Sequence, residues 1–151
     1  MAHPAKFLKK LVYAVVLLLL VASGIIWYVF TEKYDDTSTL KADYSLSAEA
    51  LLTEFGQQTQ AANRRYTEKI LEVSGTVNQV EAVDTTVNVK FVDSTTGSYA
   101  IFSFQAQDAA KARNIKAGDA VTIRGSCSGG GYSQILETAY VNFKRCTLVK
   151  P

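Results

Sequence analysis

Residue types that commonly perform catalysis or hold metals are scarce in this chain of 151 residues. The only histidine, His3, precedes a long apolar segment, so no Ser-His-Asp or Cys-His arrangement can form in the domain beyond that segment. Zinc sites usually draw on several cysteines and histidines, and two cysteines alone fall short. Asp93 and Asp119 lie in turn-like stretches and lack the spacing of a calcium loop. The sequence therefore predicts no enzyme activity, no metal and no cofactor.

The segment SCSGGG, residues 126–131, is rich in glycine. It lacks the Gly-Lys-Ser/Thr ending of a phosphate-binding loop, and no helical pattern follows it. We expect a flexible turn here that breaks the chain between two strands.

Cys127 and Cys146 are the only cysteines, and both follow the apolar segment. In an oxidising compartment a bridge between them would close a loop of about 20 residues and stabilise the fold by roughly 3 kcal/mol. A hairpin centred on the glycine run places Cys127 opposite about Val141, so a bridge to Cys146 needs a bulge or a bend. A disulfide is the favoured reading, and two buried free thiols are the alternative.

Four residues are candidates for a ligand-binding face. Asn88 and Lys90 alternate with apolar residues, so they point outward from a strand whose apolar side chains point inward. Tyr99 and Tyr132 could frame a groove beside them. Aromatic and cationic groups together suit stacking on bases or sugars. The alternative is that all four are ordinary surface and core residues of a small barrel.

The elements that would position these residues form a mainly β domain with some helix. Periodicity predicts strands over 71–77 (extending up to 83), 87–91, 99–104 and 120–127, and one within 140–149. Residues 107–114 resemble a short helix, and Ile135-Leu136 could form an extra short strand. Three strands, a helix and two more strands is the order of a five-stranded OB-fold barrel.

A leading helix precedes the barrel. Ser47 is a suitable N-cap, and Glu49 favours the positive end of the helix dipole. A stripe of apolar side chains at helical spacing follows, and we expect the helix to end between residues 66 and 69. The members of the stripe are Leu51, Leu52, Phe55, Ala62 and Tyr66.

The segment 11–30 contains 20 residues without a charged side chain, which as a helix covers the hydrocarbon core of a bilayer. Three lysines precede it and three acids follow closely, so the N-terminal tail, residues 1–10, is expected in the cytoplasm. Ala22-Ser23-Gly24 resembles a signal-peptide cleavage site, but the apolar run continues to residue 30. We therefore expect an uncleaved single-pass anchor in the inner membrane, with cleavage as the alternative.

Beyond the anchor we expect a polar linker over residues 31–43 and one domain over 44–151, periplasmic or extracellular. Three of the 16 basic residues precede the anchor, so 13 basic and 14 acidic residues remain, a net charge of −1. Proteins that neutralise many phosphates usually carry a basic excess. Nucleic-acid binding is therefore expected to be less favoured, unless residues such as Arg64, Arg65, Lys111, Arg113, Arg124, Lys144 and Arg145 converge on one face.

Several motifs resemble those of the tRNA-anti-like OB-fold family. They are YSLSAE from Tyr44, Asn63 with Tyr66 and Lys69, VSGTV over 73–77, GDAVTIRGSCSG over 118–129 and VNFKRCTL over 141–148. Members of that family are mostly small, uncharacterised bacterial envelope proteins with an N-terminal anchor or lipid attachment. The resemblance implies an OB-fold module that binds an envelope protein or an oligomeric ligand. The family name hints at single-stranded nucleic acid as the alternative.

Overall fold

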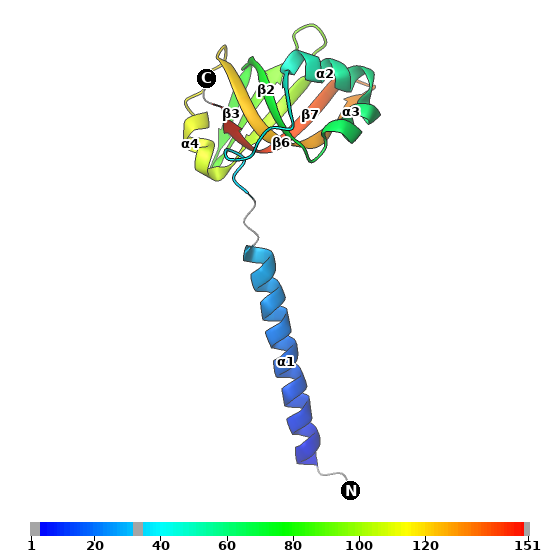
Figure 1. Ribbon diagram of the computed structural model, residues 1–151, viewed down its shortest axis with the longest axis vertical. Helices are drawn as coiled ribbons and strands as arrows, with labels where there is room; N and C mark the ends of the chain where they lie inside the picture. The colour runs from blue at the N-terminus through cyan, green and yellow to red at the C-terminus, as the bar shows by residue number, and fades with distance from the viewer. Residues whose placement is uncertain (1–3, 32–34, 150–151) are drawn as a thin grey trace. The chain divides into compact units, whose positions relative to one another are not determined.

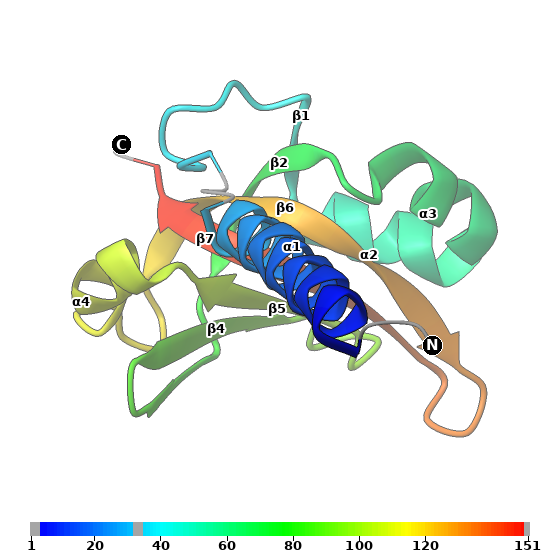
Figure 2. The same cartoon turned by 90° about the horizontal axis from the view of Figure 1, so that it is seen from below.

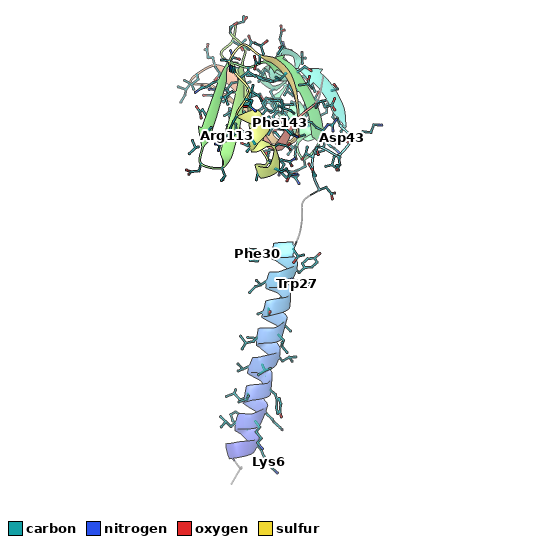
Figure 3. All side chains as sticks on the ribbon, turned by 90° about the vertical axis from the view of Figure 1, so that its left-hand side faces the viewer. Lys6, Trp27, Phe30, Asp43, Arg113 and Phe143 are labelled. Carbon is teal, nitrogen blue, oxygen red and sulfur yellow. The ribbon has the colours of Figure 1, made fainter. Side chains whose placement is uncertain are left out.

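A computed structural model of the protein describes residues 4–31 and 35–149, which fall into two compact units with a boundary after Asp35 (Figure 1). The first unit contains helix α1 (Pro4–Thr31). Within it, residues 6–31 have a mean hydropathy of 2.5 and are long and apolar enough to cross a membrane. Lys6 lies near one end of this helix, and Trp27 and Phe30 lie near the other (Figure 3). Basic and aromatic residues at opposite ends are typical of helices that meet both bilayer interfaces.

The second unit begins at Asp36, so residues 36–43 of the expected linker belong to the folded domain. The Asp36 carboxylate accepts a hydrogen bond of 2.8 Å from the side-chain amide of Gln105. Arg124 donates one of 3.0 Å to the carbonyl oxygen of Ser38. These partners are more than 60 residues away in sequence, which is why composition alone marked this stretch as a linker.

Seven strands form one sheet in the order β1-β2-β6-β7-β5-β4-β3 within the described residues. They are β1 (Tyr44–Ser47), β2 (Ile70–Thr76), β3 (Gln79–Val83), β4 (Thr86–Val92), β5 (Tyr99–Phe104), β6 (Ala120–Ser133) and β7 (Thr138–Leu148). β2 pairs with β6, and β3 pairs with β4. β2 and β3 therefore act as the two halves of one bent first strand that joins both sides of the sheet. β5 runs parallel to β7, as the third and fifth strands of an OB barrel do.

The OB fold expected from the sequence is therefore confirmed, with β1 as an added parallel strand beside β2 that the sequence did not reveal. The barrel interior holds the inward residues of each strand. Phe91, Phe102 and Phe143 are at most 2% exposed, and the Phe102 ring packs against the other two. A 3-10 turn (Ala106–Asp108) and helix α4 (Ala109–Ala112) form the expected short helix between β5 and β6.

The leading helix is split into α2 (Ala48–Gln57) and α3 (Thr59–Tyr66), which cover one part of the barrel (Figure 1). The Ser47 hydroxyl accepts a hydrogen bond of 3.2 Å from the amide of Ala50, as the N-cap prediction requires. Gln58 leaves the helical region at φ −138° and ψ 57° and so separates the two helices. All members of the apolar stripe are nevertheless buried, which confirms the predicted core-facing side.

The glycine run does not break the chain. β6 continues through it to Ser133, and the turn lies at residues 134–137, so Ile135 and Leu136 form no strand. A Cβ atom at Gly130 would lie 2.2 Å from the carbonyl oxygen of Tyr140 and 3.0 Å from the Phe55 ring. Glycine is therefore required for close packing rather than for a turn. The Asn63 side chain holds the strand there, with its amide group 2.8 Å from Gly130 O and its carbonyl oxygen 2.9 Å from Gly130 N.

Candidate ligand-binding face

The outward side chains of β4, β5 and β7 form one continuous surface on the side of the sheet opposite the core. Strand register places Lys90 beside Ile101, and Ile101 beside Asn142. The same register places Tyr99 beside Tyr140. Directly paired residues point to the same face of a sheet. The alternation of β4 predicts that Lys90 points outward, and the register shows that residues of β5 and β7 share the same outer face.

Lys90, Tyr99 and Tyr140 meet on this surface, and we call them the outer aromatic site. The Lys90 ammonium lies 4.4 Å from the centroid of the Tyr99 ring. The Tyr99 and Tyr140 rings stack with centroids 6.2 Å apart and an angle of 25° between their planes. Cation–π contact and stacking each fix the orientation of a ring before any ligand arrives. The site thus offers flat apolar surface beside a positive charge.

Gly131 allows the Tyr140 ring to lie across β6. It pairs directly with Tyr140, and a Cβ atom built on it would lie 2.6 Å from the phenolic oxygen and 2.8 Å from the ring. Any larger residue at this position would push the ring away. Gly131, the third glycine of the run, therefore contributes to the outer surface, while Gly130 contributes to the core.

The structure brings together only part of the set that the sequence suggested. Lys90 and Tyr99 are in contact, and Asn88 lies on the same face, where its carbonyl oxygen accepts a hydrogen bond of 2.8 Å from Ser103. Tyr132 does not join them. It pairs with the buried Ala139, so it points to the opposite side of β6.

Sequence reasoning missed Tyr140, although a signal was present. From Tyr140 to Lys144 every second residue is polar or amphipathic, and the residues between them are apolar. That alternation places Tyr140 on the outer face, as the structure does. The assumed turn at the glycine run hid the pairing because it put the hairpin in the wrong register.

Four of the seven basic residues that would favour nucleic acid are paired with acidic side chains in the described part of the chain. Arg65 contacts Glu54 at 2.7 Å, Lys111 contacts Asp108 at 3.5 Å, Arg124 contacts Glu72 at 2.5 Å and Lys144 contacts Glu68 at 3.0 Å. Ion pairs of this kind lower the local positive potential. Lys90 is the cation that directly contacts the outer aromatic site.

Cys127 and Cys146 are buried thiols in the structure. Cys127 pairs with Phe143 rather than with the region of Val141, because the hairpin turn lies further along the chain and β6 contains bulges. Burial raises the pKa of both thiols, that of Cys146 well above its usual value. Low thiolate content makes both poor nucleophiles. Whether the pair forms a disulfide in the cell stays a prediction.

No group of three His, Cys, Asp or Glu side chains that could hold a metal ion occurs among residues 4–31 and 35–149. His3 lies outside the described residues. The chemistry available at the outer aromatic site is stacking, apolar contact, hydrogen bonding and one positive charge.

A family model described as tRNA_anti-like matches residues 1–137, which is most of the chain. The protein belongs to the tRNA_anti-like family. The resemblance noted in its motifs is thereby confirmed. No curated protein matches this tRNA_anti-like chain in sequence.

Among solved structures, this tRNA_anti-like protein is similar to a proposed nucleic acid-binding lipoprotein from Klebsiella pneumoniae. The two share 18% identity at a TM-score of 0.52, over 79% of this chain and 100% of that one. A proposed aspartyl-tRNA synthetase from Leishmania major matches at 9% identity and a TM-score of 0.46, over 80% of this chain and 22% of that one. The first likeness shows the shared OB fold. The expectation that nucleic acid is disfavoured finds no support in a neighbour named for nucleic-acid binding.

Proposed function

We propose that the protein is a single-pass membrane protein whose OB-fold domain binds an extended ligand, without catalysis, on the outer aromatic site. The observation that carries the proposal is the contact of Lys90 with Tyr99 and of Tyr99 with Tyr140 on the outside of the barrel. OB folds bind oligomeric ligands on this strand face. Two stacked, partly exposed rings beside a lysine add little to the core, whereas they suit planar groups of a ligand.

The anchor would hold this domain at the inner membrane with the N-terminus in the cytoplasm. Helix α1 has the length and hydropathy for a span, and lysines precede its apolar part. A phosphatase fused after Pro151 should be active, whereas a fluorescent protein that folds only in the cytoplasm should stay dark. The reverse pattern would place the domain in the cytoplasm and would contradict the proposal that it binds its ligand in the cell envelope.

The ligand is either an envelope protein or oligomer, or single-stranded nucleic acid. A specific observation favours the second alternative, because aromatic stacking beside a cation is how OB folds hold single strands without reading sequence. The Klebsiella neighbour is named for nucleic-acid binding, which also supports it. The net charge of −1 beyond the anchor supports the first alternative.

Replacement of Tyr140 by alanine tests the site itself. Full-length protein in nanodiscs would be titrated with labelled single-stranded oligonucleotides and with oligosaccharide and peptide arrays. Loss of one stacked base costs about 1–3 kcal/mol, so Tyr140→Ala should weaken binding roughly 5- to 150-fold.

Tyr132→Ala is the matched control. Tyr132 is 43% exposed and Tyr140 is 37% exposed, but the two lie on opposite sides of β6. Equal losses in the two variants, or binding to none of the probes by the wild-type protein, would contradict the proposed site.

A further inference from the structure

The tip of the β6–β7 hairpin carries the most exposed aliphatic side chains among residues 36–149. Ile135 is 93% exposed and Leu136 is 69% exposed, and we call this pair the apolar tip. Figure 2 shows the hairpin, in orange, reaching beyond the other strands of the domain. Single apolar residues are common on surfaces, but two adjacent ones on a projecting turn form a small apolar patch that a partner could cover.

An open groove lies at the other end of the same two strands. Its volume is about 730 Å³, and it lies against the start of β6 and the end of β7. Val121, Leu148 and Val149 supply its apolar lining, and Lys111 of α4 stands on its rim. We call this the apolar groove. The Lys111 side chain is 69% exposed and its ammonium lies 3.5 Å from the Asp108 carboxylate, so a partner's acidic group would share this charge with Asp108.

The tip cannot enter the groove of its own molecule. β6 spans 14 residues between them, and a strand rises about 3.3 Å per residue. The two features therefore lie at opposite ends of the paired strands, about 45 Å apart along β6. Only a second molecule can bring a tip to a groove.

The two surfaces match in chemistry as well as in position. The tip offers two branched aliphatic side chains, and the groove is lined by valine and leucine side chains of similar character. Glu137 follows the tip directly, and Lys111 stands at the groove, so their opposite charges would meet at the edge of the contact. We propose that the apolar tip of one copy docks into the apolar groove of another, in a head-to-tail assembly. Because tip and groove are different surfaces, the contact repeats from copy to copy and forms rings or rows.

Such a contact is too small to hold copies together in dilute solution. Stable interfaces bury at least about 1,000 Å² in total, and two side chains cover far less. Anchoring in one bilayer raises the effective concentration of neighbouring copies and gives them a common orientation. The assembly therefore depends on the membrane, while ligand binding at the outer aromatic site does not.

Cross-linking in membranes tests the pairing. Full-length Leu136→Cys and Val149→Cys variants would be expressed separately and together, and membranes would be treated with a short thiol cross-linker. The expected result is a cross-linked dimer only when both variants are present, and a ladder of multimers from the double variant. Val83→Cys replaces Leu136→Cys in the control, since Val83 is 66% exposed at a different turn and should give no such product.

Charge reversal gives a second measurement that leaves both aliphatic surfaces intact. Glu137→Lys and Lys111→Glu should each reduce cross-linking, and the two changes together should restore it. Three results would overturn the proposal: Leu136→Cys linked to itself alone, Val83→Cys as efficient as Leu136→Cys, or Leu136→Cys shielded by lipid without any product. In each case oligonucleotide and oligosaccharide titrations on the same samples report separately on the outer aromatic site.

Discussion

Strands β5 and β7 carry one aromatic pair on each face of the sheet, and the two pairs differ in how closely the rings pack and how far they are exposed to solvent. On the inner face, Phe102 and Phe143 stack with centroids 4.6 Å apart and are at most 2% exposed. On the outer face, Tyr99 and Tyr140 stack at 6.2 Å, and Tyr140 is 37% exposed. Tyrosine combines a large apolar body with a polar tip and so remains stable in contact with water. Closed packing stabilises the barrel, whereas open packing leaves ring surface for a ligand.

The largest expected effect is on the inner face. Phe102→Ala removes a ring from the centre of the barrel and should lower the free energy of unfolding by about 3–5 kcal/mol, measured by urea titration with circular dichroism. Tyr99 lies on the same strand but on the outer face, so Tyr99→Ala should lower the free energy of unfolding by about 1 kcal/mol or less. Similar losses in both variants would show that the two faces do not differ in the way proposed.

The division between the two faces could be read from the sequence where alternation is strict. Asn88 and Lys90 were placed outward because the residues between them are apolar, and the structure agrees. The apolar stripe of the leading helix was also predicted correctly, since all of its members are buried. These predictions succeeded because each depends only on local periodicity.

The errors arose where long-range packing decides the structure. Glycine usually indicates a turn, but here Gly130 is a strand residue held by Asn63, which is 67 residues away. Bulges between Arg124 and Gly129 then shift the register, so Tyr132 lies on the side of β6 opposite the outer aromatic site, and Tyr140 was missed. No local pattern reveals such partners.

The second prediction concerns the glycine beneath the outer pair. Gly131→Ala would place a methyl group where the Tyr140 ring lies, 2.6 Å from its phenolic oxygen. The ring can rotate away, so stability should change little, but the stacked surface is lost. We expect ligand affinity to fall about 5-fold, equivalent to about 1 kcal/mol, in titrations of nanodisc samples.

Gly56→Ala is the control for that substitution. A Cβ atom at Gly56 meets only the Ala139 methyl group, at 3.9 Å, and the residue lies within α2. Alanine should therefore stabilise the helix by about 0.5–1 kcal/mol without changing affinity. Equal binding by wild type and Gly131→Ala would mean that the ligand does not use the Tyr140 ring.

The smallest expected effect concerns the charge beside the rings. Lys90→Gln keeps most of the side chain but removes the cation that lies 4.4 Å from the Tyr99 ring centroid. An exposed cation–π contact contributes about 0.5–1 kcal/mol, so affinity should fall about 2- to 5-fold. Lys116→Gln, in the turn before β6, is the control and should leave affinity unchanged.

Salt dependence then separates the two classes of ligand. If Lys90 contacts a phosphate of a single strand, the slope of log affinity against log salt should become shallower by about 0.7 in Lys90→Gln. A neutral oligosaccharide or peptide should show almost no slope in either protein, because no counterions are released. A steep slope that Lys90→Gln leaves unaltered would place the phosphate contacts elsewhere on the domain. In that case the tyrosines would still stack on the ligand, but their neighbouring lysine would serve only to hold the Tyr99 ring in place.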